Sequence, residues 1–97
     1  MMRVQILDEA EQDLLEGAQF YENQIAGLGQ YFLDSLFSDI DSLQIYGGVH
    51  SVHLGYHRLL SKRFPFAIYY RVEDNVARVR AILDCRQDPE KVKNRLN

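Results

Sequence analysis

The chain has 97 residues, of which 46% are hydrophobic and 11% aromatic, and its formal net charge is −3. This composition argues against a disordered tail, and no apolar run approaches the roughly 20 residues that a membrane span needs. The single cysteine, Cys85, excludes an intrachain disulfide and favours a reducing compartment, and the N-terminus lacks the apolar segment of a signal peptide. We therefore expect one compact cytoplasmic domain over residues 1–97 that makes no contact with a membrane.

The charges are divided unevenly along the chain. Residues 1–57 carry one base against nine acids, a net charge of −8, whereas residues 58–97 carry ten bases against five acids, a net charge of +5. An asymmetry of this size indicates a polyanionic or acidic partner for the C-terminal part.

The N-terminal half predicts a short strand followed by two helices. Residues 3–7 alternate as a strand does, and Asp8 followed by Glu11 has the spacing of a capping box at a helix start. Two apolar stripes of helical period follow, separated by Gly27 and Gly29. Their members are Ala10, Leu14, Ala18, Tyr21 and Ile25 in the first stripe, and Phe32, Leu33, Leu36, Phe37, Ile40 and Leu43 in the second. Because few residues join the helices, we expect an antiparallel helix hairpin.

The C-terminal half predicts three strands and a short helix. Residues 47–57 are interpreted as a loop, and the strands are expected at 56–60, 66–72 and 76–84. The tripeptide 73–75, Glu-Asp-Asn, is a natural turn between the last two strands. Asp88 and Pro89 then indicate the start of a basic helix or tail that runs through Arg95.

The order β-α-α-β-β-β predicts an α+β fold, with the helix hairpin packed on one face of a mainly antiparallel sheet. Alternation along the strands predicts one apolar sheet face under the helices and one basic, aromatic face toward solvent. We expect a single core that contains Leu14, Ala18, Tyr21, Phe32, Leu36, Ile40, Ile68, Tyr70, Val72, Val79, Ala81 and Leu83.

Arginines dominate the predicted solvent face, with almost no acid among them. The candidate binding residues are Arg71, Arg78 and Arg80 on the strands, Arg58, Arg63 and Arg86 near the strand ends, and the interleaved Tyr69. A guanidinium pairs bidentately with phosphate or carboxylate, and a tyrosine ring can stack on a base or on an apolar side chain. A nucleic-acid phosphate and an acidic protein segment would both fit, and an ordinary solvated face is the alternative.

The other reactive side chains have simpler interpretations. His50, His53 and His57 lie within eight residues, but no cysteine or second histidine cluster completes a zinc-ligand spacing. We therefore expect neither a metal site nor a cofactor. Cys85 lies beside Arg86, yet no histidine base neighbours it in the sequence, so a structural thiol is favoured.

Four segments in order along the chain carry a family resemblance. They are AEQDL at 10–14, GLGQYFLDSL at 27–36, HRLLSKRFPFAIYYRV at 57–72 and RQDP at 86–89, and the stretch RFPFAIYY at 63–70 is the most specific. Together they resemble the RelE/ParE superfamily, the toxins of bacterial type II toxin–antitoxin systems, also called plasmid stabilisation proteins. The resemblance implies the β-α-α-β-β-β architecture and a cognate antitoxin that wraps the toxin. It implies contact with DNA only indirectly, through the antitoxin complex.

The superfamily divides by target, and one branch resembles ribosome-dependent mRNA endoribonucleases. That chemistry needs cations at the attacked phosphate and groups that move protons. If this chain were such a nuclease, its catalytic residues would be Arg58, Arg63, Arg71 and Arg86 for charge and Asp84 for proton transfer. Asp84 stands where many relatives carry a histidine, so the resemblance to the nucleases is weak at this point.

The other branch, ParE, resembles inhibitors of DNA gyrase and needs no acid–base set. Gln87 replaces an arginine of the usual RRDP motif, and neither tyrosine nor histidine follows Tyr70. The sequence therefore favours a ParE-like toxin that arrests growth by binding gyrase, and not an enzyme. Two alternatives stay open: a nuclease that acts on the ribosome and mRNA, and a degenerate member that only binds its antitoxin.

Overall fold

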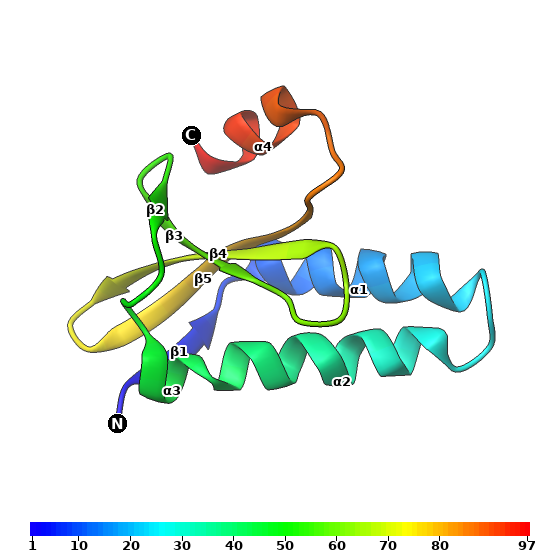
Figure 1. The fold of residues 1–97 in the computed structure, drawn as a ribbon, viewed down its shortest axis with the longest axis horizontal. Helices are drawn as coiled ribbons and strands as arrows, with labels where there is room; N and C mark the ends of the chain where they lie inside the picture. The colour runs from blue at the N-terminus through cyan, green and yellow to red at the C-terminus, as the bar shows by residue number, and fades with distance from the viewer.

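The computed structural model describes residues 1–97 and contains four helices and one five-stranded sheet (Figure 1). The elements are β1 (Arg3–Ile6), α1 (Asp8–Glu22), α2 (Leu28–Asp41), α3 (Leu43–Tyr46), β2 (Val52–His53), β3 (Tyr56–Leu60), β4 (Phe66–Glu73), β5 (Val76–Asp84) and α4 (Pro89–Leu96). The sheet order is β1-β5-β4-β3-β2, in which β1 runs parallel to β5 and the other pairs are antiparallel. The predicted α+β architecture is confirmed. None of the helices has the length and apolar character needed to cross a membrane.

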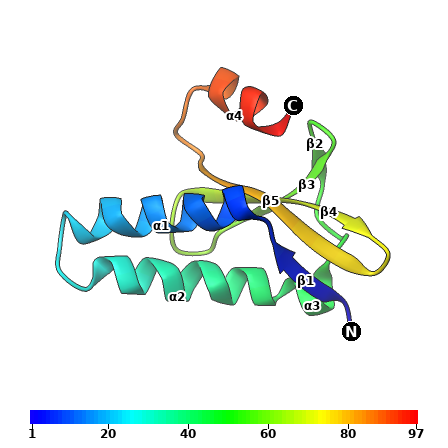
Figure 2. The same ribbon diagram turned by 180° about the vertical axis from the view of Figure 1, so that it is seen from behind.

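The helix hairpin forms as predicted, and α1 and α2 lie side by side along one face of the sheet (Figures 1 and 2). The carboxylate of Glu22, at the end of α1, accepts hydrogen bonds from the N–H groups of Gly27 (3.0 Å) and Gly29 (2.9 Å), which lower the pKa of Glu22. Gly17 lets the helices approach closely, since a Cβ there would lie 2.6 Å from Cζ of Phe32.

Two details of the predicted helices are wrong. The expected capping box does not form, because α1 already begins at Asp8 and the N-cap residue is Leu7, which has no side-chain acceptor. Ile25 lies beyond the end of α1 and is 65% exposed, so it does not belong to the buried stripe.

The two hairpin turns have the left-handed backbone that tight strand connections require. Asp74 and Asn75 have φ of 53° and 61°, and Glu73 pairs with Val76 across them, which confirms the predicted turn. The segment interpreted as a loop contains the short strand β2. Leu54 and Gly55, with φ of 55° and 84°, form the turn that joins β2 to β3.

The buried residues form two clusters on opposite faces of the sheet, and a β-bulge at Arg80 decides which residues of β5 belong to each cluster. Tyr69 pairs with Ala81 whereas the next residue, Tyr70, pairs with Val79, so Arg80 is the extra residue of β5 and the alternation shifts by one position after it. The main cluster lies between the sheet and the α1–α2 hairpin and contains, among the predicted residues, Leu14, Tyr21, Phe32, Leu36, Ile40, Ile68, Tyr70 and Val79, with Ala18 and Val72 partly buried at its margin.

The prediction of a single core is therefore wrong for Ala81 and Leu83. With the side chains of Tyr56, Ala67, Tyr69 and Leu96 they form a second buried cluster, which α4 covers on the other face of the sheet. The sheet face expected to be basic and open is thus partly apolar and closed by α4. Figures 1 and 2 both show α4 on the side of the sheet away from α2.

Candidate functional site

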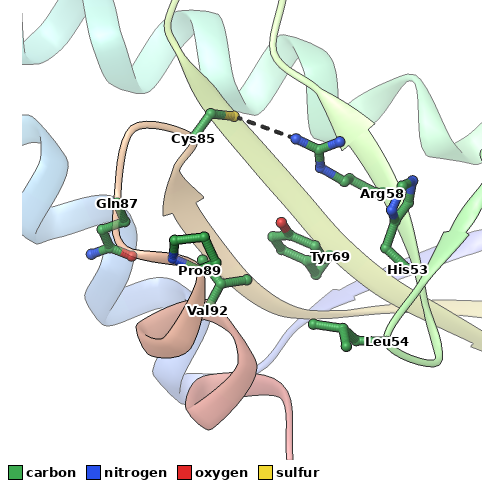
Figure 3. Close-up of a pocket in the computed structure, with 8 residues that line it drawn as sticks. All are labelled: His53, Leu54, Arg58, Tyr69, Cys85, Gln87, Pro89 and Val92. Carbon is green, nitrogen blue, oxygen red and sulfur yellow. Dashed lines mark hydrogen bonds between the residues drawn. The ribbon is translucent and has the colours of Figure 1, made fainter.

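A cleft of about 370 Å³ lies on this second face, between the β2–β3 hairpin and α4 (Figure 3). Its walls come from β2, β3, β4, the segment after β5, and the start of α4. The lining residues are His53, Leu54, Arg58, Tyr69, Cys85, Gln87, Pro89 and Val92. The cleft is therefore built from segments far apart in the sequence.

The sheet register brings Arg58 and Tyr69 together. The two residues are direct cross-strand partners on β3 and β4, so their side chains project from the same face. Tyr69 is only 6% exposed and contributes to the second core. Nη2 of Arg58 lies 4.0 Å from Sγ of Cys85, and Nε of Arg58 is buried without a hydrogen-bond partner. Arg58 lines the cleft, so its guanidinium places a positive charge at the cleft wall.

His53 is a residue of the cleft that the sequence interpretation missed. The sequence pattern indicates no ligand role for His53, but pairing of His53 with Tyr56 places it on the face that carries Arg58. Its Nε2 lies 3.2 Å from Oγ of Ser51. The signal that could have found it is the dipeptide 54–55, Leu-Gly, because a two-residue turn there pairs the flanking residues.

The other predicted strand arginines are engaged within the chain. Cζ of Arg71 lies 4.0 Å from the ring centroid of Tyr56, and its Nε donates to the carbonyl of Gly55 (3.1 Å). Arg78 donates to the carbonyl of Glu73 (3.2 Å), and Arg80 forms an ion pair with Glu9 (3.0 Å) that raises the pKa of Arg80. Arg71 and Arg78 are cross-strand partners, next to the row that holds Arg58 and Tyr69.

The remaining candidates lie apart from the cleft's centre. Arg63 is exposed in the connection between β3 and β4. Arg86 holds the carboxylate of Asp84 through two side-chain hydrogen bonds, Nε to Oδ1 at 2.9 Å and Nη2 to Oδ2 at 2.7 Å, and its backbone N–H also donates to Oδ1 (2.8 Å). Hydrogen bonds from Arg86 lower the pKa of Asp84, and the same pair raises the pKa of Arg86. Asp84 is therefore a weak proton acceptor.

A buried hydrogen-bond network holds the segment that leads into the hairpin. The hydroxyl of Tyr70, a residue with 0% exposure, accepts from the N–H of Gly48 (3.0 Å) and is hydrogen-bonded to Nδ1 of His50. His57 stacks on the Tyr70 ring and donates from Nδ1 to the carbonyl of His50 (2.6 Å). Burial, and secondarily the neighbouring His57, lower the pKa of His50. Nowhere do three His, Cys, Asp or Glu side chains gather as metal ligands.

Comparison with known proteins identifies the fold. No protein-family model matches the sequence, and no curated protein matches it. Among solved structures, the chain is similar to a chain of the chromosomal ParDE toxin–antitoxin system from P. aeruginosa, with a TM-score of 0.76 and 21% identity. The match covers 84% of this chain and 94% of that chain. This protein shares the fold of that ParDE chain. The architecture implied by the RelE/ParE resemblance is thereby confirmed.

Proposed function

We propose that the protein is the toxin of a type II toxin–antitoxin system, that it arrests bacterial growth by inhibiting DNA gyrase, and that a cognate antitoxin neutralises it in the cytoplasm. The observation that carries this proposal is the fold shared with a ParDE chain over 94% of that chain's length. The ParE-like pattern at residues 63–70 supports the same branch.

The chemistry of the predicted catalytic set favours a binding protein over a nuclease. Asp84, the expected proton acceptor, is held by Arg86 with a lowered pKa, so it is poorly suited to remove a proton from a ribose hydroxyl. Arg63 lies in a separate loop. Inhibition of gyrase by binding needs none of these proton transfers.

A ribosome-dependent endoribonuclease is the second candidate, and the cleft is the observation that favours it. His53 brings an imidazole to the face that carries Arg58, and both side chains line the cleft. In such an enzyme His53 would move protons during attack of the 2′-hydroxyl on the adjacent phosphate, and Arg58 would stabilise the charge on the phosphorane.

Two assays on the purified chain separate these functions. In the first, gyrase supercoils relaxed plasmid in the presence of increasing amounts of the protein. In the second, ribosomes carrying a defined message are incubated with it and the message is mapped for cleavage. We expect loss of supercoiling with intact messages. Cleaved messages with unaffected gyrase would establish the nuclease, and no effect in either assay would indicate a degenerate member that binds only its antitoxin.

A further inference from the structure

The chain between α3 and β3 is held to the rest of the molecule at few points. We call residues 48–55 the connecting segment, and each of them except His50 is exposed. Its short strand β2 pairs with β3 alone, and the N–H of Arg58 donates to the carbonyl of Ser51 (3.0 Å). Segments that bury few side chains open at a lower free energy than the core does. The contacts of His50 therefore carry much of what keeps this segment in place.

The turn at the end of the connecting segment adds little stability. Leu54 has φ of 55°, in the left-handed region that leucine rarely adopts. Its side chain is 55% exposed, so burial within the chain hardly offsets this strain. A two-stranded hairpin is marginally stable on its own, and the β2–β3 hairpin is short as well as strained. The hairpin therefore depends on contacts elsewhere in the segment.

His50 joins the connecting segment to a fully buried tyrosine. The hydroxyl of Tyr70, on β4, accepts from the N–H of Gly48 (3.0 Å) and is hydrogen-bonded to Nδ1 of His50. Burial raises the pKa of Tyr70, so the hydroxyl keeps its proton. All three groups are satisfied when the Tyr70 O–H donates to an unprotonated Nδ1 of His50.

His57 makes a second contact, which does not depend on its own protonation. Its ring stacks on that of Tyr70, with 5.0 Å between the centroids, and its Nδ1 donates to the carbonyl of His50 (2.6 Å). Nδ1 of His57 remains a donor when Nε2 gains a proton. Of the two histidines, His50 is therefore the one whose protonation breaks the network.

Nothing near His50 stabilises its protonated form. The titratable side chains that face it are Tyr70 from β4 and His57 from β3, and the one titratable residue of α3, Tyr46, is exposed. Residues 42–72 contain no Asp or Glu. Burial, and secondarily His57, lower the pKa of His50. The anchored segment thus favours neutral His50, and a released segment takes up a proton as the pH falls.

Release of the connecting segment would also change the cleft on the other face of the sheet. His53 and Leu54 belong to the segment, and they form the wall of the cleft that faces α4 (Figure 3). The other lining residues lie on β3, β4, α4 and the segment after β5, outside residues 48–55. The cleft would therefore lose one wall and keep the rest.

We propose that His50 is a pH-dependent anchor of the connecting segment. Neutral His50 accepts the hydrogen bond from the Tyr70 hydroxyl and holds residues 48–55 in place, whereas protonated His50 lets them open while the rest of the chain stays folded. The cleft is complete near neutral pH, and in acid its wall of His53 and Leu54 opens more often. This inference concerns the fold alone, so it holds or fails separately from gyrase inhibition.

Amide exchange of the full chain, measured residue by residue by NMR, tests the anchor. The probes are the N–H of Gly48, which donates to Tyr70, and the N–H of Arg58, which donates to Ser51. Their protection factors, which are corrected for the intrinsic pH dependence of exchange, are expected to fall by up to about tenfold from about pH 7.5 to 5.5, because opening takes up one proton at a group that titrates near 6.5 in water. Both amides should exchange faster than that of Ile68 and depend less on added denaturant, as the opening of one segment requires.

Variants identify the titrating group. His50→Asn keeps an acceptor for the Tyr70 hydroxyl and does not titrate, so the protection factors of both probes should no longer change with pH. Tyr70→Phe removes the anchor, so the protection factor of the Arg58 amide should fall several-fold at neutral pH and vary little with pH. His53→Gln is the matched control, because His53 lies in the same segment, is exposed and should leave the wild-type pH dependence intact.

The inference is wrong if the protection factors of the Gly48 and Arg58 amides do not change with pH, or if these amides open only together with that of Ile68. It is equally wrong if His50→Asn keeps the wild-type pH dependence, which would assign the titration to His57. If His50→Asn does not fold, the imidazole nitrogen shifts of the wild type decide. Nδ1 of His50 should be unprotonated at neutral pH, and a proton on Nδ1 there would contradict the anchor.

Discussion

Asp13 on α1 and Arg95 on α4 form a bidentate ion pair beside the part of β5 that extends past the end of β1. Oδ1 of Asp13 lies 2.8 Å from Nη1 of Arg95, and Oδ2 lies 2.9 Å from Nη2. The same Oδ2 accepts the N–H of Ile82 (3.0 Å), which β1 cannot pair because its ladder with β5 ends at Val79. The Asp13 carboxylate, in a residue that is 7% exposed, therefore accepts a backbone N–H that no strand pairs and also links α4 to α1.

Substitution of either partner is expected to loosen α4, but only one substitution affects the sheet. Arg95→Ala removes the pair with Asp13 and a longer contact with the exposed Glu9 (3.5 Å), and leaves the bond to Ile82. Asp13→Ala removes both the pair with Arg95 and the bond to Ile82. Each charged hydrogen bond contributes about 1.5–3 kcal/mol, so Asp13→Ala should lower the free energy of unfolding more than Arg95→Ala does. Denaturant titration measures this difference. Amide exchange at Ile82 should accelerate in Asp13→Ala alone, and equal acceleration in both variants would contradict the assignment.

The network around Tyr70 predicts that stability decreases in acid. Burial lowers the pKa of His50 in the folded chain, so the folded state disfavours the protonated imidazole. Neutral His50 therefore stabilises the folded chain above the pKa of about 6.5 that it has when unfolded. This contribution is lost as the pH falls from there through the lower pKa of His50 in the folded chain. Protonated Nδ1 would also donate to the Tyr70 hydroxyl, which already accepts from Gly48, and the hydroxyl proton would lose its acceptor.

Thermal unfolding of the wild type and of His50→Gln between pH 5 and 8 tests this prediction. The wild-type melting temperature should fall below about pH 6.5, and the decrease should be smaller in His50→Gln, which keeps an acceptor and does not titrate. His53→Gln is the control, because this histidine is exposed and outside the network. Parallel curves for the wild type and His50→Gln would exclude His50 as the cause.

The sequence predicted the elements whose formation is decided by local chemistry. The turn at Asp74 and Asn75 formed because both residues tolerate positive φ. The start of α4 formed because the Asp88 side chain accepts the N–H of Glu90 (3.0 Å) and Pro89 suits the first helical turn. The helical stripes were correct for the other positions within the helices, but Phe37 lies within α2 and is 42% exposed.

Features that depend on tertiary placement could not be predicted in this way. A bulge at Arg80 breaks the period of two on which the assignment of faces rested, so Ala81 and Leu83 changed sides. Arg80 forms its ion pair with Glu9, which lies 71 positions earlier in the chain. Within the candidate site, the neighbouring strands place Arg58 beside Tyr69, and the Leu-Gly dipeptide at 54–55 could have placed His53 beside them. Nothing local indicated that α4 would close the other side of the cleft.

The two buried clusters are expected to respond differently to truncation. Leu36→Ala removes a fully buried side chain between the helices and the sheet, so the free energy of unfolding should fall by about 2–5 kcal/mol. Leu83→Ala lies in the cluster under α4 and should accelerate amide exchange in α4 more than in α2. Hydrogen exchange of both variants measures the pattern. Uniform acceleration in Leu83→Ala would indicate one core.

Arg71 and Arg80 should differ in what their substitution changes. Arg80 is paired with Glu9 and its side chain is 24% exposed, so Arg80→Ala should lower the free energy of unfolding. Arg71 contacts the Gly55 carbonyl and the Tyr56 ring, so Arg71→Ala should accelerate amide exchange in the β2–β3 turn and change global stability less. Denaturant titration and hydrogen exchange of the two variants measure both effects. Equal exchange of the turn amides in the two variants would contradict this assignment.

His53 decides between the two candidate functions. Positioned proton-transfer groups typically contribute about 10²–10⁴-fold to a rate, so in a nuclease His53→Gln would reduce message cleavage on ribosomes by that factor. Inhibition of gyrase requires no proton transfer, so under the proposed function His53→Gln inhibits supercoiling at the wild-type concentration. Arg58→Gln removes the cleft's cation without removing the imidazole. Loss of growth arrest in both variants, with cleavage by the wild type, would replace the gyrase proposal with the nuclease.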